Sequence, residues 1–183
     1  MPAANYCARA GLEPVRASCQ RIGVTILSTF TRPQMYSCVI DDLTVNVNGP
    51  DPFVDADWEA YVLWTEDLIS RGIPVKGALT FSPFQSPNAA QRERLRQSLQ
   101  KGVQGAPRVA VLSDSAMVRG AMTALSWFIK SVHAKGYRPM ESDLAMTWLA
   151  QQLEFDAAEV RAALKKGTTA VGFTTQDAYR WFP

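Results

Sequence analysis

The sequence has few of the side chains from which catalytic and metal sites are usually built. Its 183 residues include one histidine, His133, and three widely spaced cysteines, Cys7, Cys19 and Cys38. An odd number of distant cysteines provides neither a disulfide framework nor a pair of metal ligands. Because disulfides are rare in the cytosol, we interpret the cysteines as reduced thiols of a cytoplasmic protein.

Signals for membrane insertion and for phosphate-binding loops are also missing. No apolar run approaches the ~20 residues of a membrane-spanning helix, and the opening segment lacks the apolar stretch of a signal peptide. The motifs G-x-x-x-x-G-K-[ST], G-x-G-x-x-G and G-x-S-x-G do not occur. We therefore expect no membrane span, no cofactor, no metal and no catalytic residues, and hence no enzyme.

The composition is that of a folded globular chain. Hydrophobic residues make up 47% and charged residues 20% of the sequence, and the formal net charge is +2. These values exclude disordered, collagen-like and coiled-coil classes. The length corresponds to one domain with a small appendage, at about 100–200 residues per domain.

Hydrophobic spacing predicts three opening strands, followed by alternating helices and strands. The strands are expected over residues 22–30, 35–40, 43–47, 75–81 and 108–113, and the helices over residues 57–70, 89–101, 117–134, 142–153 and a last segment after 156. Asp55 and Asp156 are the expected N-caps of the first and last helices, and Gly167 is the expected C-terminal stop of the last. Gly136 is expected to end the helix that contains His133.

This order predicts an α/β fold with a single mixed β-sheet, packed helices and a helical C-terminal extension. We expect an N-terminal arm over 1–21, an α/β domain over 22–153, and a C-terminal helix with an aromatic tail over 154–183 that docks on the domain. The expected core includes Trp58, Val111, Leu125, Phe128 and Trp148.

Charge is segregated along the chain. Residues 41–67 hold eight acidic residues and no Lys or Arg, whereas residues 71–138 hold eleven basic and two acidic residues. Such segregation can give a folded surface two faces of opposite sign, which steers charged partners. The helix over 89–101 concentrates the partner-binding candidates Arg92, Arg94 and Arg96. The alternative is that the acidic and basic segments lie side by side and pair.

A second candidate site follows the strand at 108–113. Ser113, Asp114 and Ser115 lie just past its end, and Arg119 comes one turn into the next helix. Binding crevices of open α/β sheets lie beyond the carboxyl ends of strands, so these residues could form a ligand or anion site together with the loop at 82–88. The alternative is that the serines and the aspartate cap the helix.

Five stretches resemble the SpoIIAA-like proteins, a branch of the STAS-type regulatory fold. They are a polar strand ending in Gly-Pro-Asp before Trp58, the strand VKGALTF, the strand RVAVLSD with the helix MVRGAMTALSWFI, the segment GYRPMESD, and LAMTWL. The resemblance covers about residues 22–153 and is one of spacing and hydrophobicity.

The resemblance implies a non-enzymatic domain that binds protein partners. Some STAS-type domains are switched by phosphorylation of a Ser or Thr that follows an acidic residue in the loop after the central strand. Ser82 and Ser86 stand at that place by position only, since this loop has neither the acidic residue nor the glycine of the family motif.

Two functions follow. The first is a cytoplasmic regulatory or scaffold domain that acts by protein–protein contact. Its contact surfaces are the loop and basic helix over 82–101, which include Ser82 and Ser86, and the loop that begins at Ser113. The second is a domain that binds a small ligand or anion at the strand ends, with Arg119 as the anion contact. An enzyme is the least favoured class, because no convergent titratable groups can be assembled. Nucleic-acid binding is disfavoured because the aromatic residues follow core periods, and self-association stays open.

Overall fold

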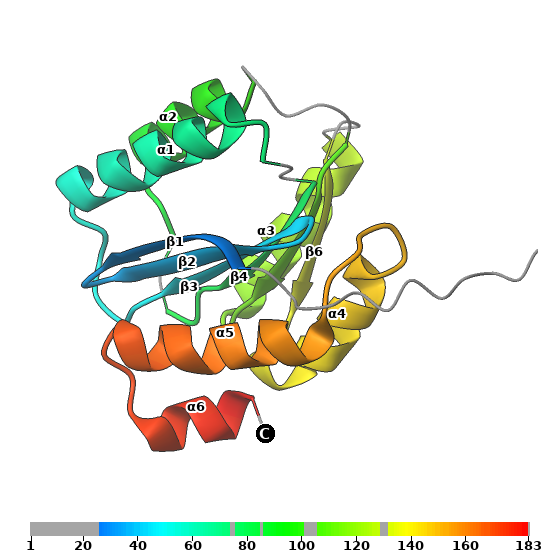
Figure 1. Cartoon of the computed structure of the whole chain (residues 1–183). Helices are drawn as coiled ribbons and strands as arrows, with labels where there is room; N and C mark the ends of the chain where they lie inside the picture. Colours follow the sequence, from blue (N-terminus) through cyan, green and yellow to red (C-terminus); the bar gives the residue numbers. More distant parts are fainter. Residues whose placement is uncertain (1–25, 74–75, 85, 101–105, 129–131, 183) are drawn as a thin grey trace, which may run out of the picture.

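The computed structural model in Figure 1 describes residues 26–73, 76–84, 86–100, 106–128 and 132–182, without the side chains of 125–128. The expected arm over 1–21, with Cys7 and Cys19, lies outside the described residues. The elements are β1 (Ile26–Arg32), β2 (Met35–Ile40), β3 (Leu43–Asn48), α1 (Asp55–Ser70), β4 (Gly77–Phe81), α2 (Ala89–Gln100), β5 (Arg108–Leu112), α3 (Ala116–Phe128), β6 (His133–Tyr137), the 3-10 turn η1 (Pro139–Glu141), α4 (Ser142–Leu149), α5 (Ala157–Ala170) and α6 (Thr175–Trp181).

Six strands form one mixed sheet, in which their spatial order is their order in the chain. β1, β2 and β3 are antiparallel neighbours, and β3, β4, β5 and β6 run parallel. The turn between β2 and β3 is Asp41-Asp42, as predicted, and Asp41 has a φ of 50°, a left-handed conformation that aspartate tolerates better than most residues. The predicted α/β class with a single mixed sheet and a helical C-terminal part is confirmed.

Helices cover both faces of the sheet (Figure 1). α1 and α2 pack together on one side, whereas α5 lies across β2 and β3 on the other, with α6 beside it. At the far end of the sheet, α3 packs on β5 and β6, and α4 also contacts these strands. The C-terminal helices therefore complete the fold that the βα units begin.

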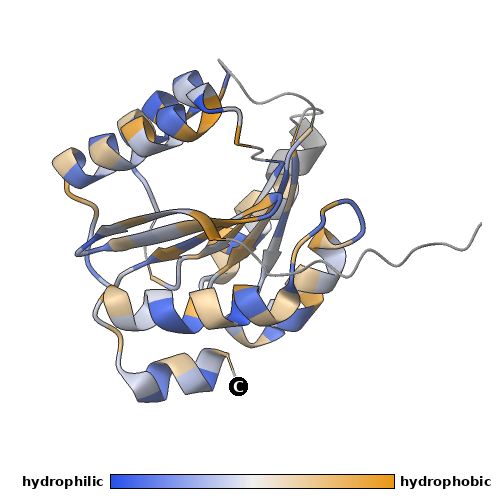
Figure 2. Cartoon of the chain, viewed as in Figure 1, coloured by the Kyte–Doolittle hydropathy of each residue, from blue (hydrophilic) through white to orange (hydrophobic). Residues whose placement is uncertain are grey.

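The larger core lies between the sheet and the C-terminal helices. Alternate residues of β2, β3 and β4 point into it, and α5 contributes one buried stripe, which gives this helix its alternating polar and apolar colouring in Figure 2. Its fully buried side chains include Tyr36, Phe81, Phe182, Ile40, Leu43, Leu79, Leu112, Leu149 and Leu164. Burial of this apolar surface is the main stabilising term of the fold.

A smaller core lies under α1, where Met35, Trp58 and Val62 are buried among half-buried aromatic rings. The residues of β3 that face this core are polar and buried, namely Thr44, Asn46 and Asn48. The Tyr61 hydroxyl donates to Asn46 Oδ1 over 3.4 Å. Burial raises the pKa of the Tyr61 phenol to about 12. This layer is therefore held by aromatic packing around a polar stripe, unlike the larger core.

The expected core is confirmed at two positions and in part at a third. Trp58 and Val111 are 5% and 7% exposed, whereas Trp148 is half-buried, with the Arg108 guanidinium 4.7 Å from the centre of its ring. The side chains of Leu125 and Phe128 lie outside the described part of the chain.

The predicted helix over 117–134 is wrong at its end. α3 is described over Ala116–Phe128, and residues 133–137 form β6, the sixth strand, which was not predicted from the sequence. The apolar residues Ile129 and Val132 continue the helical spacing of α3 in the sequence, which made the pattern read as one long helix. Consequently His133 lies on a strand, not at a helix end, and Gly136 is a strand residue.

Two predicted caps are also wrong, and one is confirmed. Val54 is the N-cap of α1 and Asp55 is its first residue, so the acidic side chain still lies at the positive end of the helix dipole. α5 continues past Gly167 to Ala170, because Gly167 lies against Tyr36 and Val47 inside the core. Asp156 caps α5 as predicted, accepting from the backbone of Ala158 over 2.7 Å.

Replacing Asp156 with alanine should lower the free energy of unfolding by about 0.5–2 kcal/mol, because two backbone N–H groups lose their acceptor. Urea denaturation followed by circular dichroism measures the change. Asp156→Asn keeps an acceptor oxygen and should lose much less. Equal losses in both variants would mean that the cap bond is not what stabilises this end of α5.

Candidate functional site

Three neighbouring parallel strands end together at one edge of the sheet. Phe81, Leu112 and Tyr137, the last residues of β4, β5 and β6, are in register. The residues that follow them are tied together, because the Ser82 N–H donates to Leu112 O over 2.9 Å and the Ser113 N–H donates to Tyr137 O over 3.0 Å. This carboxyl edge brings the loop at 82–88, residues 113–115 and η1 close to one another.

Ser113 and Ser115 shape the loop at the carboxyl edge. Ser113 is fully buried, and its hydroxyl donates to Pro83 O over 3.4 Å while accepting from the Ser115 N–H. The Ser115 hydroxyl accepts from the N–H of Val118 over 3.3 Å at the start of α3. Ser115 therefore caps α3, which is the alternative to a ligand site that the sequence offered for this segment.

Arg119 bonds to the backbone of the same edge. Its Nη1 donates to the carbonyl oxygens of Ser113 and Asp114 over 2.7 and 2.8 Å. These bonds hold the turn between β5 and α3, and they use Nη1 of the guanidinium that was expected to face an anion. Asp114, whose carbonyl oxygen accepts one of these bonds, is itself exposed to solvent.

The two serines after β4 differ in accessibility. Ser82 is 5% exposed, whereas Ser86 is exposed. Only Ser86 presents a hydroxyl that another protein could reach without a rearrangement of the loop.

The three arginines of α2 are already engaged with neighbouring groups. Arg94 bridges to α1 through Glu59 at 2.7 Å and Glu66 at 3.0 Å, and the hydrogen bonds that it donates to these carboxylates hold the pKa of its guanidinium above its usual range. Arg96 pairs with Glu93 at 2.6 Å, which lowers the pKa of that carboxyl to about 2. Arg92 donates to Pro87 O. The acidic and basic segments therefore do pair here, as the alternative interpretation held.

The sequence reading missed the apolar side chains at the carboxyl edge. Phe84, Met117 and Met140 are 63%, 83% and 67% exposed, and each follows a different one of the three neighbouring strands. We refer to these three residues as the apolar edge. The signal was present in the sequence, because each is a large apolar residue in or beside a predicted loop, where polar residues are usual.

The C-terminal tail closes one side of the same edge. The ring of Phe81 lies 4.9 Å from that of Trp181 and 5.2 Å from that of Phe182, measured between centroids. Phe84 continues this aromatic cluster, with Phe173 at 6.3 Å. Aromatic side chains thus pack together at the end of β4, where α6 meets the sheet.

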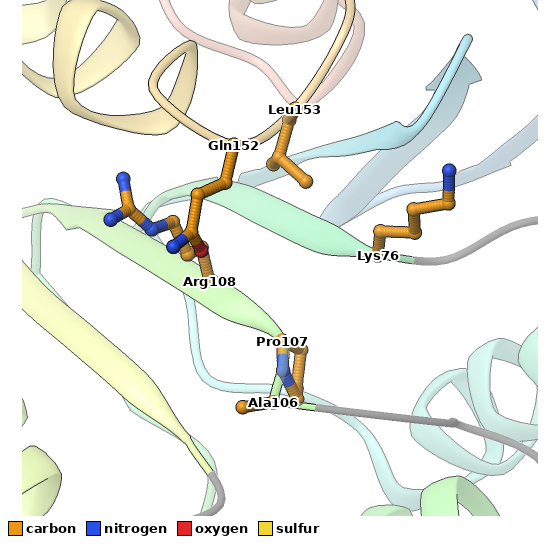
Figure 3. Close-up of a pocket in the computed structure, with 6 residues that line it drawn as sticks. All are labelled: Lys76, Ala106, Pro107, Arg108, Gln152 and Leu153. Carbon is orange, nitrogen blue, oxygen red and sulfur yellow. The ribbon is translucent and has the colours of Figure 1, made fainter.

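A hollow of about 190 Å³ lies at the opposite ends of the strands (Figure 3). It is lined by Lys76, Ala106, Pro107, Arg108, Gln152 and Leu153. Its two cationic groups point away from each other in Figure 3, and each has a partner: Lys76 pairs with Asp42 at 3.0 Å, and Arg108 donates to Trp148 O and Gln151. The hollow therefore does not direct two positive charges at one anion.

The described residues contain neither a metal-binding cluster nor a membrane-spanning helix. No group of three or more His, Cys, Asp and Glu side chains there is placed to hold a metal ion. In the same part of the chain, no helix has both the length and the apolar character needed to cross a bilayer.

Comparison of the chain with family models, curated proteins and solved structures found no significant match. The resemblance to the SpoIIAA-like proteins therefore stays a prediction, and the function is argued from the geometry of the carboxyl edge.

Proposed function

We propose that this chain is a non-enzymatic, cytoplasmic regulatory or scaffold domain that binds a protein partner through its carboxyl edge. The apolar edge carries the proposal, since three consecutive βα units each expose one large apolar side chain at the same end of the sheet. Phenylalanine and methionine are enriched at protein interfaces and are costly to leave in water.

The rest of the edge fits this role. Ser113, Ser115 and Arg119 hold the loops to one another through bonds to the backbone, so the exposed residues sit on a braced frame. Ser86 lies in the same loop as Phe84 and is exposed. A phosphate there would add charge beside the apolar edge and would weaken an apolar contact.

Small-anion binding, the alternative function, has less support. Nη1 of Arg119 serves two carbonyl oxygens within the chain, and no second cationic side chain contacts this turn in the described residues. The basic helix is also a weaker candidate surface than the sequence suggests, because Arg94 and Arg96 are paired within the chain.

The test is affinity capture of partners from the source cells, quantified by mass spectrometry, with two matched double variants. Met117→Asp with Met140→Asp places charge on the apolar edge and should release the partner. Val54→Asp with Leu63→Asp changes two apolar residues of similar exposure at α1 and should retain it. The variant of the apolar edge should keep the stability of the wild type within about 0.5 kcal/mol, as is usual for surface positions. The α1 variant should be at least as stable as the wild type, because aspartate is a better N-cap than valine at position 54.

The same variants can contradict the proposal. A set of captured proteins that is identical for the wild type and both variants would remove the apolar edge from the interface. Saturable binding of inorganic phosphate by the purified chain, abolished in Arg119→Gln, would favour the small-anion function instead.

A further inference from the structure

The outer edge of β1 carries backbone N–H and C=O groups that no strand in the described part of the chain pairs with. β1 is the first strand of the sheet, and β2 is its one strand neighbour among the described residues (Figure 1). An unpaired strand edge is a template for another strand, and proteins usually protect it with charge, proline or a bulge. In β1 such features occur at the ends, Arg32 and Pro33 at one and the irregularity between Ile26 and Ser28 at the other.

The register identifies which backbone groups point outward. Arg32 is paired with Met35 across the two-residue turn, and Pro33 has no N–H, so Arg32 and Met35 must exchange hydrogen bonds directly. Because bonded and non-bonded pairs alternate in an antiparallel ladder, Phe30 also bonds to β2. The N–H and C=O groups of Thr29 and Thr31 therefore point away from the sheet.

The side chains of β1 leave this edge accessible. Thr29 and Thr31 are exposed, and on the other face Phe30 is half-buried, with its ring 5.7 Å from that of Trp64. Ile26 and Leu27 are also exposed, at 41% and 38%. The accessible edge is thus apolar and threonine-rich between its protected ends.

We propose that β1 pairs with β1 of a second copy of this chain, in antiparallel orientation and centred on Phe30. The regular part of the strand runs from Ser28 to Arg32, and Phe30 is its midpoint. This register places Thr29 of each copy opposite Thr31 of the other copy. The outward N–H and C=O groups of both threonines, four groups in each strand, then bond across the interface. Arg32 falls opposite Ser28, so no like charges face each other.

A second copy fits this edge because Arg32 is the one charged residue of β1, and this register places the two copies of Arg32 at opposite ends of the paired strands. Phe30 falls opposite itself in a non-bonded pair, where side chains approach most closely and aromatic pairs stabilise a sheet. β1 is the edge strand at one end of the strand order, whereas β4, β5 and β6 are at the other end, so the carboxyl edge would stay available in the dimer. The inference does not depend on the proposed function.

Analytical ultracentrifugation of the full chain should show a dimer, and Thr29→Pro should weaken it by about tenfold or more. Proline removes an outward N–H twice in the symmetric dimer and leaves the bonds between β1 and β2 intact. Thr29→Val keeps the N–H and the strand preference and should stay dimeric. A monomeric wild type, or a dimer that Thr29→Pro does not weaken, would overturn the proposal.

Cross-linking tests the register without relying on the folding of the proline variant. Cys7 and Cys19 are replaced by serine, and Cys38, which lies opposite Thr29 on β2, is replaced by alanine. A mixture of Thr29→Cys chains and Thr31→Cys chains should then form a mixed disulfide on oxidation, because directly opposed positions lie within disulfide range. Either chain alone should cross-link far less, since its cysteines are offset along the strands. Equal cross-linking in all three samples would contradict the register.

Discussion

Replacing Phe81 with alanine should lower the free energy of unfolding by about 3–5 kcal/mol, the cost of removing a large ring from a packed core. Phe81 is fully buried at the end of β4, where its ring contacts Phe173, Trp181 and Phe182. The variant therefore loses buried apolar area and also the contact that joins α6 to the sheet. Urea denaturation should show a lower midpoint, and tryptophan fluorescence should report the loosened tail.

Phe84→Ala is the matched control for this prediction. The two phenylalanines are three positions apart and both approach Phe173 and Trp181, but Phe84 is 63% exposed. Its loss should cost much less stability than the loss of Phe81. If both variants unfolded at the same urea concentration, α6 would not be held by burial against β4.

The sequence predicts the fold well where one periodic pattern is unambiguous. Runs such as 35–40 and 43–47 are short, β-rich and separated by a two-residue turn, so their pairing follows from local chemistry. Asp156 is equally clear, since an N-cap needs only a side-chain acceptor at the right position. The C-terminal stop failed at Gly167 because packing against Tyr36 and Val47, which is not local, decides that position.

The candidate site was harder to predict because its side chains bond to residues far away in the sequence or to backbone atoms. Arg94 is separated by 35 and 28 residues from its partners Glu59 and Glu66, so spacing along α2 suggested a free basic surface. Arg119 looked available for an anion, although its acceptors are backbone oxygens that no side-chain motif reveals. The three residues of the apolar edge could have been found from their types. That they lie at the same end of the sheet follows only from the register of β4, β5 and β6.

β6 shows how one contact overrides a local pattern. A β-carbon added at Gly136 would lie 2.5 Å from Arg119 Cα and 2.6 Å from Arg119 O, so α3 crosses the strand with its backbone almost in contact. A glycine near the end of an apolar helical pattern reads locally as a helix stop. In the fold it is the residue that lets α3 pack on β6 and brings Arg119 within reach of the Ser113 carbonyl.

Gly136→Ala should therefore destabilise the protein by about 1–3 kcal/mol, as overpacking of a tight contact does. The clash is with backbone atoms, which cannot rotate away, so relief requires α3 to shift as a unit. Gly120→Ala is the matched control on α3 itself, since a β-carbon there meets no atom within 4 Å. It should stabilise the protein by about 0.5–1 kcal/mol, because alanine favours a helix over glycine.

Opposite signs for these two glycines are the decisive result, and differential scanning calorimetry measures both. Gly136→Ala should also raise backbone hydrogen exchange at residues 113–115, since Arg119 braces that turn through two carbonyl bonds. Stabilisation by both substitutions would mean that α3 is not held against β6 at Arg119. The bonds of Ser113 and Ser115 alone would then hold the loops of the carboxyl edge in place. The proposed function depends on these loops, because they carry Phe84, Met117 and Met140.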